Sequence, residues 1–247
     1  MLPADLIAAL DAVSTTPRLL VTSDFDGTLA PIVNNPADAR ALPAAAAALV
    51  ALAQAPNTAA ALISGRARSV LGELSAMPAA VHLVGSHGAE FESGFVQSVD
   101  EALLARIVTT LNEIAARYPG TAVEPKPASV ALHVRNASVT DSAAALAAAR
   151  AAAVGWDAEM TAGKAVLEFA VITTNKGSAI DALREQTAAT AVVFLGDDVT
   201  DEKAFARLRD SDVGVKVGAG PSAAQYRVES PEQVAEVLAQ LASRRAV

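Results

Sequence analysis

LLVTSDFDGTLAP, residues 19–31, is the stretch that decides the fold of this chain. Its apolar start, residues 19–21, predicts a buried strand, and the chain then enters an acidic turn containing Asp24 and Asp26. Side chains two residues apart on an extended backbone point to the same side, so both carboxylates are expected to face one small volume. Carboxylates that close repel one another unless a cation or a proton lies between them, and hard oxygen ligands favour Mg²⁺. On this stretch alone, an ordinary Asp-Gly turn after a strand is an equally open interpretation.

Strands and helices alternate on both sides of the middle of the chain. Residues 59–63 and 82–85 read as short buried strands, and AVVFLGDD, residues 191–198, reads as a strongly apolar strand that ends in acid. Helical patterns at 43–55 and 67–76 separate the first strands. Such alternation predicts a Rossmann-like parallel sheet wrapped by helices, in which ligands bind beyond the carboxyl ends of the strands.

The pattern changes near residue 99. From there the sequence reads as helix, hairpin, helix, hairpin, which is an α+β arrangement. We therefore predict a core domain formed by residues 1–98 and 173–247 and an α+β domain inserted into it, formed by residues 99–172. Trp156, the single tryptophan, is expected in the core of this insertion because a buried indole contributes a large apolar area.

Composition restricts the classes of function. The 247 residues are 52% hydrophobic and 19% charged, with a formal charge of -8 and no cysteine. The acidic balance argues against nucleic acid or an anionic membrane as partner, because both favour a basic surface. Disulfides and thiolate metal sites are excluded. The first residues have no basic leader before an apolar core, so we expect a cytoplasmic protein, which we also expect to be a monomer.

Four strand or helix ends together supply groups suited to phosphoryl transfer through an aspartyl nucleophile. Asp24 would attack phosphorus, and Asp26 would protonate the leaving oxygen and later take a proton from water. Ser64 offers a hydroxyl to a phosphate oxygen, and Lys176 offers positive charge and would also pair with the nucleophile. Asp197 would complete the oxygen shell of the metal. Taken singly, each of these is more commonly a turn, cap or surface residue; their order and placement together favour the functional interpretation.

The four motifs, DFDGT, SGR, NKG and GDDVTDE, occur in the order found in the haloacid-dehalogenase-like phosphatases, which the chain therefore resembles over almost its whole length. More narrowly, DFDGTLAPIVNNPADA and GSHGAE resemble the trehalose-6-phosphate phosphatases within that group. The resemblance implies an inserted α/β cap, a magnesium ion held by Asp24, the carbonyl of Asp26 and Asp197, and coupling to a trehalose-6-phosphate synthase. It also implies supporting residues beside these ligands, namely Thr28, Asp198 and Asp201.

Charged residues in the insertion are expected to recognise the sugar. Alternate strand residues share a face, so Glu124 and Lys126 on one strand, and His133 and Arg135 on the next, would line one cavity. These ExK and HxR patterns, and GKxxxE from Gly163 to Glu168, resemble sugar-binding strands of the family. A solvent-exposed strand face with surface ion pairs is the alternative. The full set of expected substrate-binding residues is Gly65, Arg66, His87, Glu124, Lys126, His133, Arg135, Lys164 and Glu168.

The sequence departs from the family pattern in two places. FAVITT stands where much of the family has Arg-Pro before the lysine motif, and Val134 stands where the family has an aromatic residue. The sugar therefore remains open between trehalose 6-phosphate and another glycosyl phosphate, of the sucrose phosphate or glucosylglycerol phosphate type. A third alternative, a catalytically silent regulatory domain, is disfavoured because every catalytic position is filled.

Overall fold

The computed structural model describes residues 2–163 and 165–246. The chain divides into two compact units, one formed by Met1–Gly94 with Thr174–Val247 and the other by Phe95–Thr173. The insertion expected over residues 99–172 falls inside the second unit. Each unit is described below by itself.

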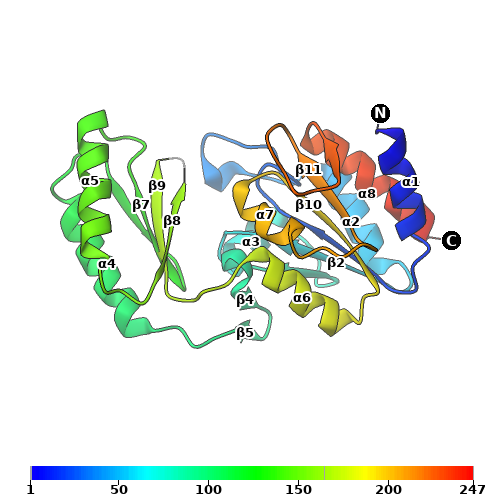
Figure 1. Cartoon of the computed structure of the whole chain (residues 1–247), viewed down its shortest axis with the longest axis horizontal. Coiled ribbons are helices and arrows are strands. Elements are labelled where there is room, and N and C mark those ends of the chain that lie inside the picture. Colours follow the sequence, from blue (N-terminus) through cyan, green and yellow to red (C-terminus); the bar gives the residue numbers. More distant parts are fainter. Residues whose placement is uncertain (1, 164, 247) are drawn as a thin grey trace. The chain divides into compact units, whose positions relative to one another are not determined.

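The larger unit is built on a six-stranded parallel sheet (Figure 1) with the strand order β12-β11-β10-β1-β2-β3. The parallel sheet expected from the alternating pattern is therefore confirmed. Its strands are β1 (Leu19–Ser23), β2 (Thr58–Ile63), β3 (Val81–Val84), β10 (Ala191–Gly196), β11 (Val213–Val217) and β12 (Tyr226–Val228). The short edge strand β12 was not expected from the sequence, since three residues are too few to show a period.

Helices cover both faces of this sheet, which explains why its central strands are apolar without alternation. Leu19 and Val21 pack with the helices of one face, whereas Leu20 packs with those of the other. The first face carries α1 (Ala4–Val13), α2 (Pro43–Gln54), α3 (Arg68–Ser75) and α8 (Pro231–Arg245). The second carries α6 (Lys176–Thr187) and α7 (Val199–Phe205).

The alanine-rich helix α2 packs against α8. Its buried face contains Ala45, Ala48, Leu49 and Leu52. Small side chains let helix backbones approach closely, and alanine also has the highest helix propensity. Pro43 opens the helix at a position where its missing N–H has no intrahelical partner to lose.

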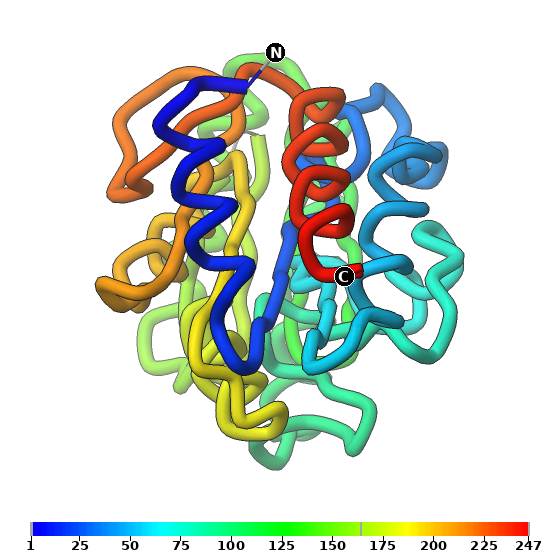
Figure 2. Tube along the Cα trace, turned by 90° about the vertical axis from the view of Figure 1, so that its right-hand side faces the viewer, coloured from blue at the N-terminus to red at the C-terminus, as the bar shows by residue number. Residues whose placement is uncertain are grey.

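The terminal helices α1 and α8 lie side by side, as the first and last coloured segments of Figure 2 show. The remaining elements of this unit are short connections: η1 (Pro36–Asp38), η2 (Ser86–Gly88) and the hairpin strands β4 (Glu90–Phe91) and β5 (Gly94–Phe95). The hairpin expected in SHGAEFESG is confirmed.

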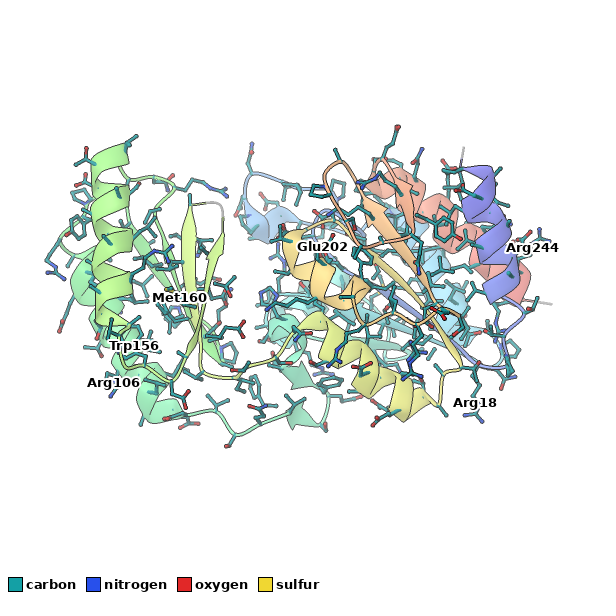
Figure 3. The ribbon with its side chains drawn as sticks, in the orientation of Figure 1. Arg18, Arg106, Trp156, Met160, Glu202 and Arg244 are labelled. Atoms are coloured by element: carbon teal, nitrogen blue, oxygen red, sulfur yellow. The ribbon has the colours of Figure 1, made fainter. Side chains whose placement is uncertain are left out.

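The smaller unit is a four-stranded antiparallel sheet with two helices, as the helix-hairpin repeat predicts. Its strand order is β6-β7-β9-β8. The elements are α4 (Glu101–Ala115), β6 (Ala122–Pro125), β7 (Ser129–His133), α5 (Val139–Ala152), β8 (Glu159–Gly163) and β9 (Val166–Ala170). Leu132, Leu167 and Phe169 form a core with the helices. Trp156, labelled in Figure 3, packs against this core, as expected. Its ring lies edge-on to Phe169 at a centroid distance of 5.2 Å.

Among the helices of residues 2–163 and 165–246, none is long and apolar enough to cross a membrane.

Candidate active site

The order of the strands reverses between β1 and β10. The chain leaves β1 toward β2 on one side, and β10 lies on the other side. At such a reversal of strand order the connections diverge and leave room for a ligand beyond the carboxyl ends. Asp24 directly follows β1, and Asp197 directly follows β10. The fold therefore brings together two acidic turns that are more than 170 residues apart in the sequence.

Asp24 is buried and held from three sides. Its side chain is 7% exposed, and its main-chain N–H donates to the carbonyl of Leu195 on β10 at 2.9 Å. Its Oδ1 accepts hydrogen bonds from the N–H of Phe25 at 2.7 Å and from the ammonium of Lys176 at 2.8 Å. These contacts fix the direction in which the carboxylate points.

Lys176 bridges two buried carboxylates from the first turn of α6. Its Nζ lies 2.8 Å from Asp24 Oδ1 and 2.7 Å from Asp201 Oδ1. Asn175 caps the helix by accepting from the N–H of Ser178 at 3.1 Å, which places the lysine. Burial alone would lower the pKa of Lys176, but the two carboxylates outweigh it and raise that pKa, so the side chain stays charged.

Asp197 completes the acidic group. Its Oδ1 accepts a hydrogen bond from the hydroxyl of Thr28 at 3.2 Å. Burial, reinforced by the charge of Asp201, raises the pKa of Asp197 to about 6. Burial likewise raises the pKa of Asp24 well above its ordinary value, with Lys176 opposing and the other carboxylates adding to the shift. Asp24 and Asp201 share the ammonium of Lys176. Among the described residues, the carboxylate of Asp197 has only the hydroxyl of Thr28 as a hydrogen-bond partner. Such a group of carboxylates suits a further cation.

The donor set fits a divalent cation. Oxygens of Asp24, Asp197 and Asp201 all lie within 4.8 Å of one another. Both oxygens of Asp201 already have partners: Lys176 on Oδ1, and the N–H groups of Asp197 and Asp198 on Oδ2, each at 3.0 Å. Asp24 and Asp197 are therefore the carboxylates with coordination capacity to spare. The sequence also named the carbonyl of Asp26, for which the structure provides no test.

GDDVTDE serves as a helix cap and as part of the site at once. Asp198 is the N-cap of α7, and Asp201 completes a capping box with it. Because Asp201 also pairs with Lys176, the cap joins two motifs.

Gly27 is required by the close approach of the two acidic turns. Its φ is +82°, and a Cβ placed on it would lie 2.2 Å from Asp197 Oδ2. Any larger residue would therefore displace the carboxylate that follows β10.

Asp26 forms a two-pronged ion pair with Arg66. Arg66 Nε donates to Asp26 Oδ2 at 2.7 Å, and Nη2 donates to Oδ1 at 2.6 Å. The guanidinium carbon also lies 5.9 Å from the centre of the Phe25 ring. The first and second motifs are thus joined through side chains, a contact that sequence reasoning did not find.

The turn after β2 is interlocked with the segment at His87. Ser64 is buried, and its hydroxyl accepts from the N–H of Arg66 at 3.2 Å. The N–H of His87 donates to the carbonyl of Ser64 at 2.9 Å, and the N–H of Ser86 to that of Arg66 at 2.7 Å. A Cβ on Gly65 would lie 2.5 Å from the His87 ring. The structure therefore places His87 against the SGR turn, two features that the sequence had named separately.

The smaller unit gathers polar side chains on the face of its sheet away from the helices. Cross-strand register aligns Glu124, Ala131, Glu168 and Thr161 in one row. Glu168 Oε1 accepts from Lys126 Nζ at 3.0 Å and from Ser129 Oγ at 2.6 Å. These contacts join β9 to Lys126 in the turn after β6 and to Ser129 at the start of β7.

A second contact on this face pairs Glu124 Oε2 with His133 Nε2 at 2.8 Å. Val134 is buried in the helix-side core. Its lack of an aromatic ring therefore leaves the polar face unaltered.

Three of the expected sugar-binding residues differ from the expected arrangement. β6 ends at Pro125, so Lys126 lies in the turn beyond the strand on which it was expected. β7 ends at His133, so Arg135 lies in an exposed turn beyond the strand and the expected alternation does not extend to it. Lys164 lies outside the described residues.

In this structure an aspartate follows the first strand of a parallel sheet at the point where strand order reverses. A buried lysine joins it to a second acidic turn. This arrangement defines the haloacid-dehalogenase-like class of hydrolase. The family model described as trehalose-phosphatase matches residues 22–233. This chain belongs to that family.

Curated relatives agree with the family model. A trehalose-phosphate phosphatase of Mycobacterium ulcerans is 35% identical over 93% of this chain and 63% of its own length. The trehalose-6-phosphate phosphatase of Escherichia coli is 35% identical over 83% of this chain and 79% of its own length. The chain thus spans less than two thirds of the mycobacterial relative.

A solved structure has the same fold. The C-terminal domain of a Candida albicans trehalose-6-phosphate phosphatase has a TM-score of 0.82 at 24% identity, covering 98% of both chains.

Proposed function

We propose that this chain hydrolyses trehalose 6-phosphate to trehalose and inorganic phosphate, with Asp24 as the nucleophile. The observation that carries the proposal is the fixed Asp24 carboxylate at the reversal of strand order, paired with buried Lys176 and close to Asp197. Family membership and the names of the two relatives supply the substrate.

The reaction proceeds in two displacements. Because Phe25 and Lys176 both contact Asp24 Oδ1, we assign the attack to Oδ2. A bond forms between this oxygen and phosphorus while the bond between phosphorus and the sugar oxygen breaks, and Asp26 gives its proton to that oxygen. Water then attacks phosphorus, Asp26 recovers a proton from it, and the aspartyl–phosphate bond breaks to release phosphate.

Arg66 must release Asp26 for these proton transfers. Both oxygens of Asp26 are engaged by the guanidinium, so at least one hydrogen bond has to break before Asp26 reaches the leaving oxygen. An incoming phosphate dianion offers Arg66 a second acceptor for the same two-pronged geometry. We propose that the substrate itself draws Arg66 away in this manner.

Magnesium is the proposed cofactor, held by Asp24 and Asp197. When bound, it would neutralise charge on the phosphate and on the surrounding carboxylates. Ser64 and Lys176 contribute a hydroxyl and a positive charge to the phosphate oxygens. Asp201 orients Lys176 and the main chain at Asp197.

The polar face of the smaller unit is proposed to recognise the sugar. Glu124 and Glu168 present carboxylates in one cross-strand row, and Lys126, in the turn after β6, pairs with Glu168.

The experiment is a phosphate-release assay across a panel of sugar phosphates. With purified protein and Mg²⁺, trehalose 6-phosphate is expected to give kcat/KM at least about 100-fold above glucose 6-phosphate and sucrose 6-phosphate, since each sugar hydroxyl matched by a buried polar group contributes strongly. Chelation of the metal is expected to abolish release. Comparable turnover of unrelated sugars would contradict the assignment of trehalose, and faster turnover of sucrose phosphate would favour the alternative glycosyl phosphate.

A further inference from the structure

We propose that Lys216 is a positioning residue that holds Asp197 in place and thereby sets the affinity of the site for a divalent cation. The inference rests on the proposed function only in taking Asp197 as a cation ligand. Nothing in the sequence motifs pointed to this lysine.

Lys216 is a buried cation at the edge of the site. It lies on β11 in register with Gly196 at the end of β10, and its side chain is 6% exposed. Its ammonium donates a hydrogen bond to the main-chain carbonyl of Asp197. A charged donor makes one of the stronger hydrogen bonds in proteins, and burial strengthens it further.

This bond completes a clamp on the main chain at Asp197. On the other side, the N–H of Asp197 and the N–H of the next residue both donate to Asp201 Oδ2 at 3.0 Å. Asp197 is therefore held through its N–H, its carbonyl and the following N–H. Its own carboxylate has the weaker 3.2 Å contact with Thr28, so the direction of the side chain depends mainly on the clamped main chain.

Glu202 balances the charge of Lys216. Its Oε1 lies 3.9 Å from Lys216 Nζ, is buried, and has no hydrogen-bond partner within the described part of the chain. Its Oε2 accepts from the N–H of Ala223 at 2.8 Å, which ties the loop after β11 to α7. Figure 3 labels Glu202 on this helix. The pair thus joins β11, α7 and the acidic turn.

Charge and position predict opposite effects of removing Lys216. A nearby positive charge repels a bound cation, so its loss alone would tighten Mg²⁺ binding. Loss of the clamp instead frees the main chain at Asp197 and weakens binding. Removing residues that orient metal ligands typically costs about 10–100-fold in affinity.

The experiment titrates Mg²⁺ into the metal-free protein by calorimetry, without substrate. Lys216→Met is expected to weaken binding about 10-fold or more, whereas Lys216→Arg, which keeps the charge and the donors, is expected to stay within about three-fold of the parent. Unchanged or tighter binding by Lys216→Met would overturn the proposal. Failure of the parent to bind Mg²⁺ would instead contradict the proposed function.

Asp212→Asn is the matched control for loss of a buried ion pair. Asp212 pairs with Arg184 and accepts from the N–H of Val192 near the start of β10, at the opposite edge of the sheet. This variant is expected to lower the melting temperature and leave the Mg²⁺ affinity unchanged. If it weakens Mg²⁺ binding as much as Lys216→Met does, general destabilisation explains both results and the positioning role is wrong.

Glu202→Gln decides the question if Lys216→Met does not fold. Its side chain is 30% exposed, so the substitution is tolerable. Loss of the counter-charge leaves the ammonium of Lys216 free to shift. A two- to five-fold weaker Mg²⁺ affinity is therefore expected, which corresponds to about 0.4–1 kcal/mol of binding free energy. No change would overturn the proposal.

Discussion

At Asp197, function and stability oppose one another. Burial and the neighbouring Asp201 raise its pKa to about 6 from the ordinary 3.8. A carboxyl group whose pKa is higher in the folded state binds its proton more tightly there, so folding loses stability as pH rises through the interval between these values. The charged group needed by the site is therefore a cost to the metal-free fold.

Replacing Asp197 with Asn is expected to stabilise the metal-free protein at pH 7.5 and to have little effect at pH 4. The gain is about 1–2 kcal/mol, because partial exposure screens the full effect of the shift. Thermal melts of both proteins across this pH range provide the measurement. Mg²⁺ should stabilise the parent more than the variant. A variant equally or less stable than the parent at pH 7.5 would contradict the origin assigned to this pKa.

Gly27→Ala is expected to reduce phosphatase activity by at least about 100-fold, because the new Cβ would stand 2.2 Å from Asp197 Oδ2. Gly155→Ala is the control, since Gly155 has a similar φ of +85° and no atom of the described residues lies within 4 Å of the added Cβ. Both variants carry the strain of a positive φ, about 1 kcal/mol, which melting curves will report. Similar activity in the two variants would show that backbone strain, rather than the contact with Asp197, explains the loss.

Sequence reasoning named the residues of the site and the pairing of Lys176 with Asp24, but not the other contacts among them. Asp24, Lys176 and Asp197 could be named because each follows an apolar strand or begins a helix in a motif. The pairing of Arg66 with Asp26 and the clamp formed by Lys216 depend on side-chain directions across neighbouring strands. A one-dimensional pattern does not contain those directions.

At the scale of elements, the two units illustrate different sequence signals. The continuous apolar run in β10 indicated a strand covered on both faces, whereas β9 alternates and has one polar face. The end of β7 was misjudged because the HVR pattern continues the alternation to Arg135, whereas the chain turns after His133. Strand ends are set by turn geometry and packing, which the pattern of residues only partly records.

Lys126→Met is expected to raise KM for trehalose 6-phosphate about 10-fold or more while leaving turnover of a small aryl phosphate within about two-fold. The physical reason is that Lys126 and Glu168 form one hydrogen-bonded group on the polar face of the smaller unit. Arg106→Ala, on the exposed side of α4 (Figure 3), removes a positive charge from the same unit and serves as the control. Equal losses toward both substrates would place Lys126 outside sugar recognition.

At the scale of the whole molecule, the end of the chain holds together the amino edge of the large sheet. The guanidinium of Arg245 donates to Thr58 Oγ1 and to four main-chain carbonyls between 2.8 and 3.1 Å. These carbonyls belong to the segments that precede β1 and β2. The division into two units was predicted from a change of period in the sequence. The hydrogen bonds of Arg245 could not be predicted, because a single arginine near a terminus belongs to no repeating pattern.

Arg245→Ala is expected to lower stability by about 1–2 kcal/mol, since water replaces only part of the lost hydrogen bonds. For a chain of this size that corresponds to a fall in melting temperature of about 2–8 °C. Arg18→Ala is the control, because it removes an exposed positive charge at the same edge (Figure 3). An equal fall in both variants would indicate an effect of net charge.

The measurement that tests the central claim most directly is the rate of phosphate release from trehalose 6-phosphate by Asp24→Asn beside the parent protein, with saturating Mg²⁺. The amide preserves the shape of the buried side chain but cannot form the bond to phosphorus. The account predicts a fall of about 10⁴-fold or more with a folded protein. A variant that retains activity within about ten-fold of the parent would contradict the assignment of Asp24 as the nucleophile.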